Sequence, residues 1–180
     1  MLIFHCAPTL AGIKPANLFC YRYDSDECMK TTIAECRNLL LDRGVEFFVL
    51  RNRHQVCLIY VYRLKELNKI INTYKNQKFL LEKGYANFSH PAEVLALLAR
   101  NFSASIHFPH EVGLFLGYPL EDVIGFIRNK GENYYQVGPW KVYSDQENAV
   151  KKFEKFKKCT MIYKRLFSEG KTLKQLAVPV

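Results

Sequence analysis

Two runs of apolar residues in the first third of the chain give the clearest prediction of secondary structure. Residues 45–50 and 56–62 are almost continuously apolar and are joined by the polar segment 51–55. Continuous apolar character, in place of alternation, indicates strands that are covered on both faces. The pattern therefore predicts a pair of strands in the middle of a sheet. Residues 17–23 predict a further strand, and residues 2–5 predict a short one.

Apolar residues recur at helical spacing over most of the remaining chain. Asp24 as a cap, with Glu27 three residues on, predicts a helix start, and Gly44 predicts its end. The buried face of this helix is expected to carry Met29, Ile33, Cys36 and Leu40. Further helices are predicted over residues 64–74, 79–83 and 90–98, and from Pro109 and from Pro119.

The last predicted helix is strongly amphipathic. A capping box at Ser144–Glu147 starts it, and Gly170 ends it. Its apolar face carries Ala149, Phe153, Phe156, Tyr163 and Phe167, and the opposite face carries Lys151, Lys155, Lys158 and Arg165. This separation is typical of a surface helix that packs against the body of a domain.

The order of these elements predicts a single α+β domain over residues 1–180. A strand pair, several helices and a late strand within residues 134–143 favour a mixed or antiparallel sheet of about four to five strands. The regular β-α-β alternation of a Rossmann sheet is missing. A length of 180 residues fits one domain with its own core.

Composition narrows the class of protein further. A hydrophobic fraction of 49% and a charged fraction of 24% exclude a disordered chain. The sequence contains no apolar run of membrane-spanning length, and its first residues lack the features of a secretory signal. We therefore expect a cytoplasmic protein without a membrane contact. Its six cysteines form no C-x-x-C pair, which predicts reduced, mostly buried thiols.

The positive charge is concentrated near the end of the chain. The net charge is +9, and residues 151–174 hold nine Lys or Arg residues against two acidic residues. A basic surface of this kind fits either a solvated helix face or the binding of nucleic acid phosphates. The sequence favours the solvated face, and nucleic-acid binding is the weaker alternative.

Candidate catalytic chemistry comes from two short segments. No nucleotide-binding or common hydrolase motif is present, so no cofactor is expected. Cys6 precedes the predicted turn at Pro8, whereas His110 and Glu111 lie in the first helical turn after Pro109. The sharpest hypothesis is a thiol-dependent hydrolase or transferase in which Cys6 is the nucleophile, His110 the base and Glu111 the orienting carboxylate. The simpler alternative is a buried thiol and ordinary helix-start residues.

The leading interpretation is a small protein that binds a ligand or a protein partner at a polar Cys/His site. Thr9 and Lys14 are candidate ligand-binding residues beside the thiol, and His107 is a third candidate. Arg51 and Arg53, in the turn between the two apolar runs, are candidates for a small anionic ligand. A metal site that uses His107 and His110 is disfavoured, because two histidines three residues apart are common by chance.

Several blocks of the sequence resemble those of one family. These blocks are Cys6–Lys14 (CAPTLAGIK), Asn17–Phe19 (NLF), Pro109–Pro119 (PHEVGLFLGYP), Trp140–Tyr143 (WKVY) and the lysine-rich helix up to Cys159. They resemble an uncharacterised family from anaerobic Gram-positive bacteria that is catalogued as a domain of unknown function. The resemblance spans nearly the whole chain and implies a stand-alone bacterial cytoplasmic protein. It implies no activity, cofactor or catalytic residue.

Overall fold

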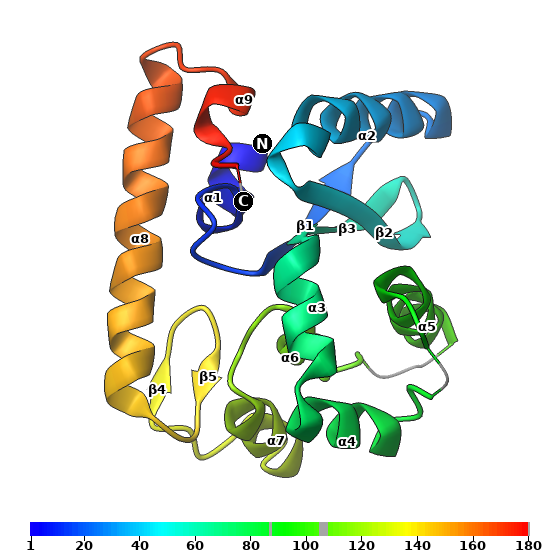
Figure 1. Cartoon of the computed structure of the whole chain (residues 1–180), viewed down its shortest axis with the longest axis vertical. Helices are drawn as coiled ribbons and strands as arrows, with labels where there is room; N and C mark the ends of the chain where they lie inside the picture. The colour runs from blue at the N-terminus through cyan, green and yellow to red at the C-terminus, as the bar shows by residue number, and fades with distance from the viewer. Residues whose placement is uncertain (87, 105–107, 180) are drawn as a thin grey trace.

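A three-stranded antiparallel sheet lies at the centre of the molecule. The computed structural model of the chain (Figure 1) describes residues 1–86, 88–104 and 108–179. The strands follow the order β1 (Ala16–Arg22), β3 (Val56–Arg63) and β2 (Val45–Arg53). The predicted α+β class and the pairing of the two apolar runs are confirmed. The sheet has three strands, fewer than the predicted four to five.

β3 is the central strand, and β2 is an edge strand. β3 is buried along nearly its whole length because helices cover both faces of the sheet. The end of β2, residues 51–53, is exposed. The prediction that both strands occupy the middle of the sheet is therefore wrong for β2. An apolar run indicates that both faces of a strand are covered, but it does not indicate whether the strand lies in the middle or at the edge of the sheet.

Side chains alternate between two hydrophobic clusters, one on each face of the sheet. Ile59 and Val61 of β3 pack on the face covered by α1 (Leu2–Leu10), α2 (Asp26–Leu40) and α9 (Leu173–Leu176). Tyr60 and Tyr62 pack on the other face, against helices of the middle of the chain. These helices are α3 (Leu64–Asn72), α4 (Tyr74–Glu82), α5 (Pro91–Ala104), α6 (Val112–Phe115) and α7 (Leu120–Arg128).

The first residues of the chain form helix α1, so the prediction of a short strand there is wrong. Ile3, Cys6 and Leu10 are buried at spacings that match one helical face. The helix contains Pro8 near its end, where the missing N–H removes a hydrogen bond of the last turn. Pro8 therefore lies near the end of a helix, and not in a turn after a strand as predicted. Gly12 follows in the left-handed conformation, with a φ of 70°.

Helix α2 begins and ends close to the predicted positions. Its cap is Ser25, whose hydroxyl accepts a hydrogen bond from the backbone N–H of Cys28 (3.2 Å), so the predicted cap at Asp24 is wrong by one residue. Met29 and Ile33 are buried as predicted. A short 3-10 helix, η1 (Leu41–Arg43), extends α2, and the expected Gly44 then ends the segment with a φ of 67°.

A buried arginine connects the end of β3 to the two neighbouring helix ends. Arg63 is 1% exposed, and its guanidinium donates hydrogen bonds to the carbonyl oxygens of Thr9 (2.7 Å), Leu10 (2.5 Å) and Arg43 (2.8 Å). These three carbonyls lie at the ends of α1 and η1, and those of Thr9 and Leu10 also accept from the backbone N–H groups of Gly12 (3.1 Å) and Val178 (3.0 Å). Arg63 therefore holds the ends of α1 and η1 against the sheet.

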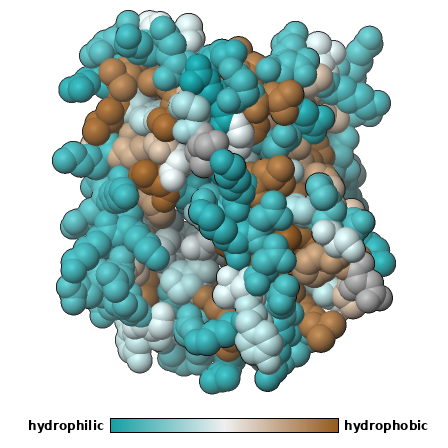
Figure 2. Space-filling view, viewed as in Figure 1, coloured by the Kyte–Doolittle hydropathy of each residue, from teal (hydrophilic) through white to brown (hydrophobic). Residues whose placement is uncertain are grey.

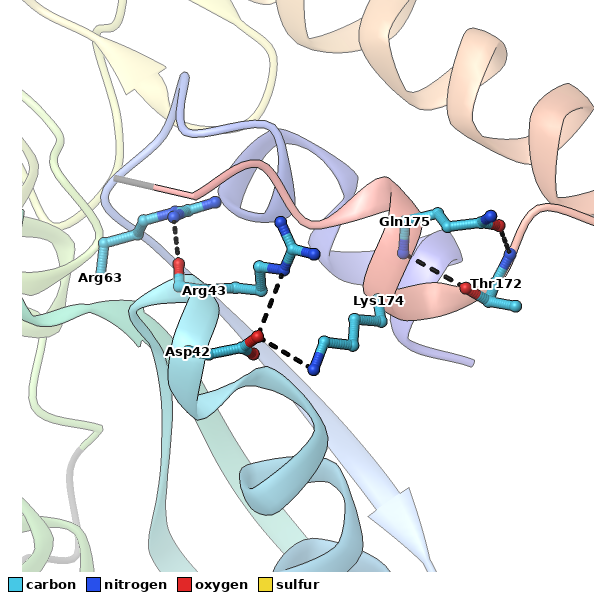
Figure 3. A network of polar contacts seen from close by, with 6 residues as sticks. All are labelled: Asp42, Arg43, Arg63, Thr172, Lys174 and Gln175. Carbon is cyan, nitrogen blue, oxygen red and sulfur yellow. Dashed lines mark hydrogen bonds and ion pairs between the residues drawn. The ribbon is translucent and has the colours of Figure 1, made fainter.

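The C-terminal helix is attached to the same region. Figure 3 shows the ammonium of Lys174 in α9 beside the carboxylate of Asp42, at 2.9 Å. Thr172 and Gln175 form a capping box that starts α9. The pKa of Asp42 is lowered, mainly by its hydrogen bond from Lys174.

The long helix α8 (Gln146–Ser168) runs along one side of the molecule (Figure 1). Ala149 and Cys159 are buried, and hydrophilic residues cover most of the outer side of the helix, at the left of Figure 2. Asp145 caps the helix by accepting from the N–H of Asn148 (3.1 Å), so the predicted Ser144 capping box is wrong by one residue. Within the described ranges, no helix has the length and apolar character needed to cross a membrane.

Candidate functional site

An apolar cleft of about 390 Å³ opens between α6, α7 and a hairpin formed by β4 (Gln136–Val137) and β5 (Lys141–Val142). Four aromatic side chains contribute to its walls. They are Phe108, Tyr118, Phe126 and Trp140. His110, Asp122 and Lys141 are its charged or titratable lining residues. A concave apolar site with a few polar groups is the usual form of a small-molecule site.

A buried aspartate fixes the hairpin over the cleft. Asp122 in α7 is 2% exposed, and its Oδ2 accepts a hydrogen bond from the indole Nε1 of Trp140 (2.7 Å). Its Oδ1 accepts from the backbone N–H groups of Tyr143 (2.8 Å) and Ser144 (2.9 Å) and from the Ser144 hydroxyl (2.7 Å). Four donors compensate the burial of this carboxylate. The position of Trp140 therefore depends on α7.

The indole of Trp140 is packed between two further aromatic rings. The ring of Tyr118 stacks on it at 4.9 Å, and the ring of Phe153 from α8 meets it edge-on at 4.5 Å. The Tyr118 hydroxyl donates to the carbonyl of Pro139 in the hairpin (3.0 Å). Burial raises the pKa of Tyr118 to about 12, so this hydroxyl stays protonated at neutral pH. These contacts make one wall of the cleft rigid.

Lys141 and His110 bring polar atoms to the lining of the cleft. The Lys141 ammonium donates to the carbonyl of Gly131 (2.8 Å) and lies 4.6 Å from the centre of the Tyr134 ring. The exposed His110 imidazole lies 4.8 Å from the ring of Phe126 and 5.8 Å from that of Phe108. His110 thus lines the cleft at its surface.

Glu111, the neighbour of His110, points into a buried polar network. Its Oε1 accepts hydrogen bonds from the hydroxyl of Tyr85 (2.8 Å) and the amide of Asn101 (3.3 Å). The Asn101 amide also donates to the Tyr85 hydroxyl (3.0 Å). Burial, followed by the adjacent Glu111 charge, raises the pKa of Tyr85. Among the described residues, Glu111 forms no hydrogen bond with His110, so the orienting role predicted for Glu111 has no support.

The structure separates the proposed nucleophile from the proposed base. Cys6 is fully buried in the hydrophobic cluster on the α1 face of the sheet. Val112, two residues after His110, belongs to the cluster on the opposite face. Burial raises the pKa of the Cys6 thiol to about 12, which disfavours the reactive thiolate. The geometry gives no support to catalysis by Cys6 and His110.

Thr9 and Lys14 lie near Cys6, outside the lining of the cleft. Thr9 is fully buried, and its hydroxyl donates to the side-chain oxygen of Asn17 (2.7 Å). Lys14 is 6% exposed, and its ammonium lies 5.4 Å from the centre of the Tyr118 ring, behind the cleft wall. Burial lowers the pKa of Lys14 to about 8. The surroundings of Thr9 and Lys14 therefore indicate a structural role for both residues.

The remaining candidate residues lie elsewhere. Arg51 and Arg53 are exposed at the end of β2, and the Arg53 Nε donates to the adjacent His54 (3.1 Å). His107 lies outside the described residues. In the part of the chain that the structure describes, no group of three or more His, Cys, Asp or Glu side chains is arranged to hold a metal ion.

Sequence reasoning missed Asp122, Tyr118 and Tyr85 as residues of the candidate site. Asp122 follows Glu121 in the first turn of α7, where acidic residues ordinarily favour the helix dipole. Tyr118 follows the predicted break at Gly117 and directly precedes Pro119. The available signal was the clustering of aromatic residues in the blocks around Pro119 and Trp140, but this signal does not tell core from cleft.

The fold and the cleft define an α+β protein with an aromatic-lined cleft on the face of the sheet that α3 to α7 cover. The sequence model of one family, described as "Protein of unknown function (DUF3793)", matches residues 2–177. The chain belongs to this family. Neither a curated protein nor a solved structure matches the chain.

Proposed function

We propose that this protein binds a small, largely apolar molecule in the cleft between α6, α7 and the β4–β5 hairpin. The observation that carries this proposal is the cleft itself, whose volume of about 390 Å³ lies in the usual range for small-molecule sites. Asp122 and the aromatic stack around Trp140 support it, because they keep the cleft open before a ligand arrives. Such preorganisation lowers the entropic cost of binding.

The lining indicates the chemistry of the ligand. The faces of Phe126 and Tyr118 suit an aromatic ring or a short alkyl chain. The Lys141 ammonium is already held by the carbonyl of Gly131, so it contributes less than a free cation to the binding of an anion. His110 is the polar residue at the surface of the cleft. A mainly apolar body with one polar end matches this lining.

Calorimetric titration with 4-phenylbutanol tests the proposal. This probe combines a phenyl ring and a short chain with a neutral polar end. A site of this size predicts saturable binding of one molecule, with a dissociation constant of about 0.1–10 mM. Absence of saturable binding over this range would contradict the proposal.

Two matched substitutions locate the bound probe. Val137, in the lining of the cleft, is 55% exposed, and Val178, near the C-terminus, is 45% exposed. Val137→Asp places a charge against the apolar site and should weaken binding at least about fivefold. Val178→Asp introduces the same charge away from the cleft lining and should leave binding unchanged. An equal effect of both substitutions would place the probe elsewhere.

A second candidate function, nucleic-acid binding, is favoured by the outer face of α8. Lys155 and Lys158 are exposed there, and neither forms an ion pair with a described residue. Lys151 and Arg165 of the same helix do have acidic partners, Glu147 and Glu169. Unpaired lysines on one exposed helix face are suited to contact phosphates, with an affinity that falls steeply as salt increases.

Fluorescence anisotropy with a labelled 20-nucleotide DNA, single-stranded and duplex, tests this second candidate. The paired substitution Lys155→Glu/Lys158→Glu should abolish binding at low salt. The control, Lys75→Glu/Lys78→Glu, changes the net charge equally at exposed positions of α4. If α8 is the binding surface, the control retains most of the binding. Equal losses, or no binding by the wild type, would exclude this function for α8.

A further inference from the structure

A second, more polar hollow adjoins the aromatic cleft. Its volume is about 320 Å³, and it shares Phe108 and His110 with the cleft. Glu111 and Asn101 line it on the side of α5 and α6, and Lys83 also contributes to its lining. Because the two hollows have residues in common, they lie side by side.

Glu111 is a buried carboxylate without a cationic partner in the described chain. It is 9% exposed, and it forms no ion pair with any residue that the structure describes. Both of its hydrogen bonds, from Tyr85 and Asn101, go to Oε1. Its Oε2 accepts no hydrogen bond from the described residues. A largely buried carboxylate that lines a hollow and receives only neutral donors from the described residues is suited to a cationic partner.

We propose that the ligand is an amphiphilic amine whose ammonium pairs with Glu111 in the second hollow, while its apolar body occupies the aromatic cleft. This inference rests on the proposed function, since it names the polar end of the same ligand. Tyr85 and Asn101 position the carboxylate by holding Oε1. Oε2 is then the oxygen that receives the N–H groups of the ammonium.

Lys83 is an exposed cationic residue in the lining of this hollow. Its ammonium lies 5.8 Å from the centre of the Phe79 ring. Lys83 would repel an ammonium in the second hollow. Its neutralisation should therefore strengthen the binding of an amine without affecting an uncharged ligand.

Three probes with one apolar body and different ends test the inference by calorimetry: 4-phenylbutylamine, 4-phenylbutanol and 4-phenylbutanoate. The amine should bind at least about tenfold more tightly than the alcohol, and the carboxylate more weakly than either. The net charge of +9 would by itself favour the carboxylate. A preference for the amine therefore has to come from a local negative group. If all three probes bind equally, the inference fails while the proposed function stands; if none binds, both fail.

Glu111→Gln separates the role of the charge from a purely structural role. Glutamine retains a side-chain oxygen that can accept from Tyr85 and Asn101 and removes only the negative charge. We expect the preference for the amine over the alcohol to disappear, with the affinity for the alcohol retained. A preference that persists in Glu111→Gln would overturn the inference. Lys83→Met supplies a second test in an exposed position: the affinity for the amine should rise at least about twofold, and an unchanged affinity would count against the inference.

Discussion

The indole Nε1 of Trp140 donates a 2.7 Å hydrogen bond to Oδ2 of Asp122, and both groups are buried. This contact joins the β4–β5 hairpin to α7 across the wall of the aromatic cleft. Because the other oxygen of Asp122 accepts three hydrogen bonds from the chain just after β5, one carboxylate fixes both the indole and the start of the segment that leads into α8. The shape of the cleft therefore depends on a residue outside the hairpin.

Replacement of Asp122 by asparagine should destabilise the protein markedly. The amide offers one acceptor oxygen where the carboxylate offers two, so either the Trp140 donor or the three donors at Oδ1 lose a partner. We expect a loss of about 2–4 kcal/mol in the free energy of unfolding, measured in urea. Glu121→Gln, the same chemical change at the exposed neighbouring position, should cost less than about 0.5 kcal/mol. Equal losses would show that the Asp122 network contributes nothing.

Removal of Arg63 should be among the most damaging changes in the chain. Arg63→Met removes the hydrogen bonds to the carbonyls of Thr9, Leu10 and Arg43, of which the first two keep a backbone donor, and should lower the free energy of unfolding by about 3 kcal/mol. The matched control is Arg37→Met, because among the described residues Arg37 donates to one carbonyl, that of Phe47, and pairs loosely with Glu46 (4.0 Å). It should cost less than about 1.5 kcal/mol. A loss of similar size in both variants would refute this role of Arg63.

Lys14 should make stability depend on pH. Burial lowers its pKa in the folded state from 10.5 to about 8. Between these two values the unfolded chain holds more protons on Lys14 than the folded chain, so the free energy of unfolding rises with pH. Lys14→Met should therefore be more stable than the wild type at pH 7 by about 1–3 kcal/mol.

The advantage of Lys14→Met should shrink by about 1 kcal/mol when the pH is raised to about 9. Chemical denaturation at the two pH values measures this change. Lys65→Met, at an exposed position of α3, should show no such change. An advantage that stays constant or grows with pH would mean that the Lys14 ammonium is not penalised by burial.

The sequence predicted those features of the fold that depend on local pattern. The β2–β3 pair follows from two continuous apolar runs, and the buried face of α2 follows from helical periodicity, because the order of apolar residues determines which faces are buried. The N-terminal strand prediction failed because α1 is short and contains Pro8, a residue that is disfavoured inside helices and therefore indicated a turn. Local pattern alone could not distinguish this short helix from a short strand followed by a turn.

The candidate site could be predicted only in part. The sequence placed His110 in a polar site with Cys6, whereas His110 lines an apolar cleft and Cys6 packs on the other face of the sheet. The face of the sheet on which a helix packs depends on tertiary connections that periodicity does not contain. In the same way, the sequence does not show whether an acidic residue at the start of a helix faces solvent or is buried. Asp122 is buried and accepts four hydrogen bonds.

The indole N–H resonance of Trp140 tests the central claim most directly. Trp140 is the only tryptophan of the chain, so a ¹⁵N-labelled sample gives one indole cross-peak, from a group in the cleft wall. Titration with 4-phenylbutanol should shift this peak progressively to saturation, with the same dissociation constant as the calorimetric titration. An indole peak that stays in place while the calorimeter records saturable binding would show that the cleft is not the ligand site.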